Sequence, residues 1–106
     1  MTSNKRVVIT GMGQISPLGS NVQSLWEAIE NGRSGVGPLT SFPESAFPLG
    51  IAAEAKQFTG KIEDFGELDK DRKKAIRKAL KVMCRECQMG VAAAQLALAD
   101  ASIVPG

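Results

Sequence analysis

The chain has 106 residues, of which 43% are hydrophobic and 23% charged, and its formal net charge is +2. This is the size of one domain, with no second domain expected, and the composition excludes a disordered or collagen-like chain. Histidine is absent, which excludes a Ser-His-Asp triad, a Cys-His pair and a His-ligated metal site within the chain.

Residues 7–10 are the first predicted element, a buried strand, because β-branched residues follow one another there without a helical period. Gly11 and Gly13 interrupt its end, and residues 16–19 (Ser-Pro-Leu-Gly) predict a turn. This opening resembles a dinucleotide-binding loop. However, Ser16 and Pro17 stand where that loop needs small residues and a free amide. We therefore interpret the glycines as allowing a sharp turn at a sheet edge.

An amphipathic helix of about three turns is predicted next. Ser20 as N-cap and Gln23 three residues later fit a capping box, and Gly32 fits the position just after the helix. Four apolar residues recur at helical spacing: Val22, Leu25, Trp26 and Ile29. Their common face predicts packing against a core or an interface.

Residues 33–50 contain several glycines and prolines and predict an irregular segment that packs against another part of a protein. Residues 51–55 predict a short, weak strand, and residues 59–68 a loop or a single turn of helix. From residue 72 to residue 101 the pattern predicts one long helix, in which Gly90 marks a bend or a close helix crossing.

The first half of the long predicted helix is strongly basic on one face. Seven Lys and Arg lie between residues 72 and 85, with no acidic residue among them. Such a helix face is most often simply exposed to solvent. A surface that carries only positive charges also attracts an acidic partner. The residues of this face are Lys74, Arg77, Lys78, Lys81 and Arg85. No aromatic residue lies among them, so nucleic-acid stacking is not supported and no nucleic-acid partner is expected.

Cys84 and Cys87 form a single CxxC motif within the long predicted helix. We predict that both pack as small apolar side chains, because free cysteine is commonly buried. The alternatives are a redox or metal role, or an adventitious disulfide. A structural zinc site needs four ligands and the chain offers only these two cysteines, so no metal and no cofactor are expected.

The predicted elements do not complete a domain. Residues 89–101 are apolar on nearly every side of the helix, and such a helix needs cover on every side. Two short strands form a marginal sheet on their own. We therefore expect either the front end of a larger protein or a small domain that self-associates. No apolar run is long enough to span a membrane or to form a signal-peptide core, so a cytoplasmic protein without a membrane partner is expected.

Several segments together resemble β-ketoacyl-acyl-carrier-protein synthases of the elongating, type II kind. Residues 6–19 (RVVITGMGQISPLG) are similar to the opening of these enzymes, and Trp26 is similar to a residue of their next helix. Residues 31–38 (NGRSGVGP) match a pattern that commonly reads G-x-S-G-I. Further similarity lies at Phe42, residues 52–58 and residues 88–101. Cys84 departs from the family, which often has Asp at this place after Met.

The resemblance implies a fold and a reaction for the parent protein. The fold is α/β and thiolase-like, a layered αβαβα arrangement of two similar halves, normally a homodimer. This chain is expected to supply its N-terminal portion, residues 1–106, as strand, helix, short strand and long helix, incomplete as a domain. The reaction is a decarboxylative Claisen condensation, in which an acyl group on an active-site Cys is attacked by malonyl-acyl-carrier protein after loss of CO₂.

The resemblance also implies what this chain lacks. The catalytic Cys, two His and a Lys of the family lie downstream of this region, and neither Cys84 nor Cys87 matches the nucleophile's motif. The chain alone is thus expected to be inactive, with no catalytic, cofactor-binding or metal residue. The family docks its acidic carrier protein on basic residues before the helix that starts near Met83, where Arg77, Lys78 and Lys81 lie here. The alternatives are a chain-length-factor-like subunit without the Cys, or a free-standing module that binds an acidic partner.

Overall fold

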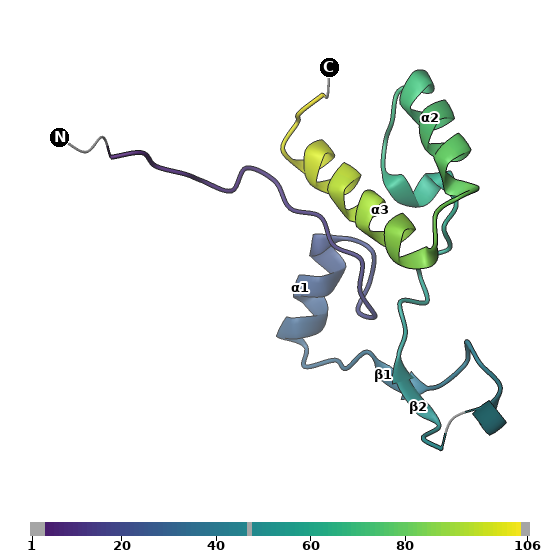
Figure 1. Cartoon of the computed structure of the whole chain (residues 1–106). Helices are drawn as coiled ribbons and strands as arrows, with labels where there is room; N and C mark the ends of the chain where they lie inside the picture. Colours follow the sequence, from purple (N-terminus) through teal and green to yellow (C-terminus); the bar gives the residue numbers. More distant parts are fainter. Residues whose placement is uncertain (1–3, 47, 105–106) are drawn as a thin grey trace.

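The computed structural model describes residues 4–46 and 48–104 as an α/β chain of three helices, a two-stranded sheet and two 3₁₀ turns. In chain order these are α1 (Val22–Glu30), β1 (Val36–Pro38), η1 (Glu44–Ala46), β2 (Ile51–Ala53), η2 (Ile62–Phe65), α2 (Lys70–Leu80) and α3 (Arg85–Asp100). Helices α2 and α3 lie side by side at one end, and the small sheet lies at the other (Figure 1).

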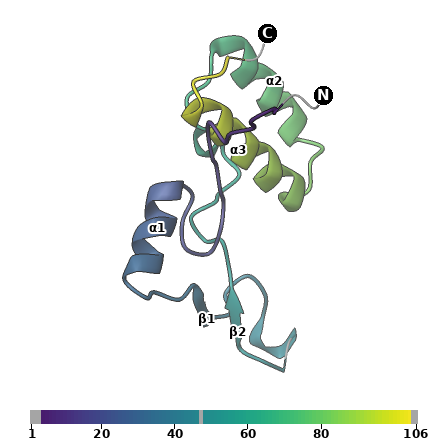
Figure 2. The same cartoon turned by 90° about the vertical axis from the view of Figure 1, so that its left-hand side faces the viewer.

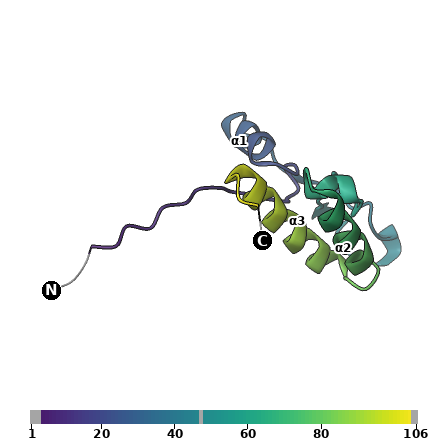
Figure 3. The same ribbon diagram turned by 90° about the horizontal axis from the view of Figure 1, so that it is seen from above.

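The predicted strand at residues 7–10 is wrong: these residues are extended but form no strand. The side chains of Val7, Val8 and Ile9 are 94%, 69% and 82% exposed, and the segment runs out away from the helices (Figure 3). A strand needs a hydrogen-bonding neighbour, and the described residues place none beside this segment. Its β-branched sequence is therefore left without a partner.

Gly11 and Gly13 pass directly over α3, which explains their lack of side chains. A Cβ atom on Gly13 would lie 2.2 Å from the carbonyl oxygen of Ala93, and one on Gly11 would lie 2.4 Å from that of Ala97. The backbone N–H of Met12, between them, donates a 2.9 Å hydrogen bond to the Asp100 carboxylate. Close approach to a helix, rather than a sharp turn, thus requires these two glycines.

The predicted turn at residues 16–19 and the helix after it are confirmed. Ser16 and Gly19 exchange two backbone hydrogen bonds of 3.0 and 3.1 Å. The N-cap of α1 is Asn21 and not Ser20, because the Asn21 side chain accepts from the backbone N–H of Ser24 at 2.8 Å. The Gln23 side chain donates to Glu27 at 2.8 Å instead of closing a capping box.

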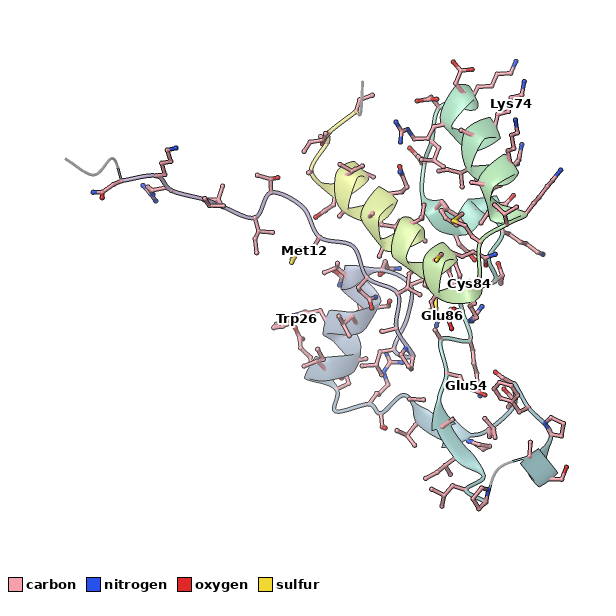
Figure 4. The ribbon with its side chains drawn as sticks, viewed as in Figure 1. Met12, Trp26, Glu54, Lys74, Cys84 and Glu86 are labelled. Atoms are coloured by element: carbon pink, nitrogen blue, oxygen red, sulfur yellow. The ribbon has the colours of Figure 1, made fainter. Side chains whose placement is uncertain are left out.

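The apolar face of α1 is only partly covered. Trp26 and Ile29 are 58% and 56% exposed, and Ala28 is the buried residue of the helix. Trp26 points away from the rest of the chain (Figure 4). An exposed aromatic on an amphipathic helix is typical of an interface, so the alternative of core packing for Trp26 is wrong in this structure.

β1 and β2 pair antiparallel, with Val36 opposite Ala53 and Pro38 opposite Ile51. β2 confirms the start of the weak strand predicted at residues 51–55 but ends at Ala53. β1 lies within the segment predicted to be irregular, because its sequence, Val-Gly-Pro, carries little strand propensity. Figure 2 shows this sheet beyond α1, away from α2 and α3.

The prediction of a single long helix for residues 72–101 is wrong, because the helix is interrupted between Leu80, where α2 ends, and Arg85, where α3 begins. Cys84 has extended backbone angles and is the N-cap residue of α3. The Gln88 side chain stabilises the break by donating to the carbonyl of Met83 at 3.1 Å. The break lets α2 fold back, so that Ile76 of α2 and Ala92 of α3 enter one buried cluster.

That cluster is the core of the chain. It contains Phe58, Ile62, Phe65, Ile76 and Ala92. The turn expected within residues 59–68 is confirmed as η2, which supplies two of these side chains. The radius of gyration is 17.1 Å, against about 13 Å for a compact domain of this length. The chain therefore has a small core and large uncovered surfaces.

Glu54 joins the end of β2 to the preceding loop. Its carboxylate accepts from the Thr40 hydroxyl at 2.7 Å and from the backbone N–H groups of Thr40 and Ser41 at 3.0 and 2.9 Å. These hydrogen bonds, that of the Thr40 hydroxyl first, lower the pKa of Glu54 from 4.5 to about 2. The carboxylate thus holds the loop only while it is ionised.

A pH-dependent stability follows from this lowered pKa. The contribution of Glu54 is expected to be fully present above pH 4.5 and to be lost as the pH falls towards 2. Urea unfolding of the protein and of Glu54→Gln across this range measures it. The stability difference between the two proteins should shrink as the pH falls, because the amide that replaces the carboxylate does not titrate. A difference that stays constant down to pH 2 would contradict the proposed role of the ionised carboxylate.

Candidate functional site

Helix α2 is well specified by its sequence. The Asp69 side chain caps it by accepting from the backbone N–H of Arg72 at 2.7 Å, and Asp71 lies in the first turn. Arg77 and Lys78 lie in the last turn, where the partial negative charge of the helix end favours cations. On the opposite face Ile76 is buried against the core. These features fix which side of α2 faces solvent.

The solvent side of α2 carries four of the five predicted docking residues. Lys74, Arg77, Lys78 and Lys81 are all exposed. Lys74 points outward, away from α3 (Figure 4). Across residues 4–46 and 48–104, no carboxylate oxygen lies within 4.0 Å of any of these four cations. We call these four residues the basic face.

Arg85, the fifth predicted docking residue, is held differently. Its guanidinium donates to the carbonyl oxygens of Phe58 at 3.1 Å and Ala55 at 2.9 Å. It also lies 5.3 Å from the centre of the Phe58 ring, in a cation–π arrangement. Arg85 therefore attaches the start of α3 to the segment after β2, and it is not brought together with the basic face. No periodicity in the sequence indicates this role.

Cys84 and Cys87 are exposed, so the prediction that they pack in the core is wrong. Their sulfur atoms lie 3.4 Å apart at the first turn of α3. Hydrogen bonding to Cys84 raises the pKa of the Cys87 thiol, and the charge of Glu86 acts in the same direction. The CxxC spacing in the sequence did indicate that the two cysteines are neighbours. However, the predicted continuous helix placed them in the middle of a helix, where burial was expected.

Other kinds of site find little support in the described part of the chain. It contains no group of three or more His, Cys, Asp or Glu side chains arranged to hold a metal ion. None of its helices combines the length and the apolarity that crossing a membrane requires. An open hollow of about 500 Å³ lies beside the small sheet. Its lining offers no acid, base or nucleophile and consists of Leu39, Phe42, Pro48, Leu49, Ile51 and Ala52.

The described residues thus form an α/β segment with an exposed basic face on one side of α2. Comparison with known families makes the assignment specific. Residues 4–106 match the model described as "Beta-ketoacyl synthase, N-terminal domain". The chain therefore belongs to the β-ketoacyl synthase family and represents part of its N-terminal domain.

Curated relatives carry one common name, "3-oxoacyl-[acyl-carrier-protein] synthase 2". The protein of Synechocystis is 40% identical over 101 residues, which are 94% of this chain and 21% of that protein. The protein of Staphylococcus aureus strain COL is 38% identical over 103 residues, 97% of this chain and 22% of that protein. The Coxiella burnetii protein is 54% identical over 54 residues, 51% of this chain and 13% of that protein. The chain thus spans about a fifth of the length of the relatives that it matches along most of its own length.

Proposed function

We propose that this chain is the N-terminal part of a 3-oxoacyl-[acyl-carrier-protein] synthase of fatty-acid biosynthesis. In this reaction an acyl group is held as a thioester on an enzyme Cys. Malonyl-acyl-carrier protein loses CO₂, and the resulting carbanion attacks the thioester and releases the Cys thiolate. The observation that carries the proposal is the match to the family along nearly the whole chain, together with the name borne by the Synechocystis and Staphylococcus aureus relatives.

The chain's own part in this reaction is binding and not chemistry. It has no His, and its two cysteines lie at the start of α3. We propose that the catalytic groups come from the rest of a thiolase-like enzyme, of which residues 1–106 are the N-terminal portion. The uncovered faces of α1 and of residues 7–10 then pack within that enzyme or its homodimer. Free exposed thiols fit a cytoplasmic location.

The basic face supplies the contact with the acyl-carrier protein in this proposal. Its four cations are exposed on one side of α2 and have no acidic neighbour within ion-pair distance in the described residues. Charges of one sign repel each other, and an acidic partner relieves that repulsion. Because the cations are exposed, their effect acts on the rate of encounter and weakens with salt. Arg85 is not part of this surface, because its guanidinium is bound within the chain.

Charge reversal on the basic face tests this docking role. In the whole native protein, the variant combining Lys74→Glu, Arg77→Glu, Lys78→Glu and Lys81→Glu is expected to bind acyl-carrier protein about a hundredfold more weakly at low salt. Surface plasmon resonance or fluorescence anisotropy measures the affinity. Most of the loss should lie in the association rate, and it should diminish as salt is raised.

Arg33→Glu is the matched control, because Arg33 is an exposed cation that follows α1, away from α2. It should change the affinity for the carrier protein by less than about threefold. Circular dichroism should show that both variants keep their helical content. If the control lost as much binding free energy per reversed charge as the fourfold variant does, only net charge would matter, and docking on α2 would be refuted. Loss of docking would leave the family assignment intact, since that rests on the sequence match.

A further inference from the structure

The cysteine pair at the start of α3 has the geometry of a dithiol that can close on itself. Cys84 is the N-cap residue and Cys87 lies one turn later, so both side chains are on the same side of the helix start. Their sulfur atoms are 3.4 Å apart and both residues are exposed. A disulfide needs a sulfur separation of about 2.05 Å, which small side-chain rotations at an exposed helix end supply without moving the core.

We propose that Cys84 and Cys87 form a reversible redox site, in which a low-molecular-weight disulfide oxidises the two thiols to a disulfide across the first turn of α3. No role in condensation is assigned to either cysteine. The proposal does not depend on the function proposed above, because it rests only on the placement of the two thiols. The break between α2 and α3 creates the site by placing Cys84 at a helix end.

The exchange is balanced in two steps. The Cys84 thiolate attacks one sulfur of glutathione disulfide, forms a mixed disulfide and releases one glutathione thiolate. The Cys87 thiolate then attacks Cys84 Sγ, closes the protein disulfide and releases the second glutathione. The two protein thiols lose two electrons and two protons, and glutathione disulfide is reduced to two glutathione molecules.

The surroundings favour Cys84 as the first nucleophile. It is the N-cap residue of α3, and its side chain makes no capping hydrogen bond there. The hydrogen bond with Cys84 raises the pKa of the Cys87 thiol, which keeps Cys87 protonated until the mixed disulfide forms. A metal site is less well supported, since the described residues contain no group of three or more His, Cys, Asp or Glu side chains arranged to hold an ion.

The test uses the whole native protein equilibrated with glutathione and glutathione disulfide, once with and once without a metal chelator. After alkylation of free thiols, trypsin digestion and mass spectrometry identify the state of each cysteine. Trypsin cleaves after Lys81 and after Arg85, between the two cysteines. The disulfide therefore appears as a linked pair of peptides, one covering residues 82–85 and one beginning at Glu86. The linked pair is expected to rise with the oxidant and to disappear on adding dithiothreitol.

Cys87→Ser is the matched variant, because it keeps the first thiol and removes the second at an exposed site. It should retain the mixed disulfide at Cys84 at a level about tenfold above that of the unmodified protein, since no second thiol is there to displace it. The proposal is overturned if both thiols stay free, if both carry separate glutathione groups, or if they react only after addition of urea. Protection of both thiols that the chelator abolishes would also overturn it in favour of a metal site.

Discussion

Replacing Phe65 with Ala is expected to lower the free energy of unfolding by about 3–5 kcal/mol. Phe65 is 0% exposed and is the largest fully buried side chain of the described residues. Its ring centre lies 6.2 Å from that of Phe58, at an interplanar angle of 59°. Removing the ring leaves a cavity in the cluster to which η2, α2 and α3 all contribute.

Urea unfolding followed by circular dichroism measures this loss. Leu49→Ala is the control, because Leu49 is 70% exposed, and it should change the stability by less than about 0.5 kcal/mol. Phe65→Leu should give an intermediate loss, since it keeps part of the buried volume. If Phe65→Ala were no more destabilising than Leu49→Ala, the cluster around η2 would not be the core of the protein.

Gly13→Ala is expected to destabilise the protein by about 1–3 kcal/mol, although it adds only one methyl group. The new Cβ would lie 2.2 Å from the carbonyl oxygen of Ala93 and 2.6 Å from the backbone nitrogen of Ala97. Both are backbone atoms of α3, so relief requires the whole helix or the crossing segment to move. The expected loss is therefore large for so small a substitution.

Gly90→Ala is the same substitution in an open place and should have the opposite sign. Nothing lies within 4 Å of a Cβ at this position, and Ala is favoured over Gly within a helix by about 1 kcal/mol. Thermal unfolding of the two variants in parallel gives the comparison. The close crossing of residues 11–13 over α3 would be disproved by equal shifts in the two melting temperatures.

The sequence predicted those elements whose signals are local. The turn at residues 16–19 and helix α1 follow from glycine, proline and apolar spacing within a few residues. The N-cap shifted from Ser20 to Asn21 because two adjacent residues can both cap. The basic face was also predictable, since three of its cations lie on α2 opposite the buried Ile76, and the fourth, Lys81, is the C-cap residue of the same helix.

Features that depend on distant contacts were not predictable in this way. The helical period runs without interruption through residues 80–85, so only the packing of Ile76 and Ala92 into one cluster explains the break. Arg85 shares the spacing of the cations of the basic face, yet its guanidinium donates to the carbonyl oxygens of Ala55 and Phe58. Residues 7–10 have the composition of a β-strand, but they form none, because the described residues provide no neighbouring strand for them to pair with.

The proposed parent of this chain is an enzyme that extends acyl chains by condensation. The most direct measurement incubates the whole native protein with an acyl-acyl-carrier protein and malonyl-acyl-carrier protein, and follows the product by mass spectrometry. The expected product is a 3-oxoacyl-acyl-carrier protein whose acyl group is two carbons longer than the one supplied, formed with loss of CO₂. Carrier protein that binds without forming this product would contradict the claim and would indicate a non-catalytic relative of the family.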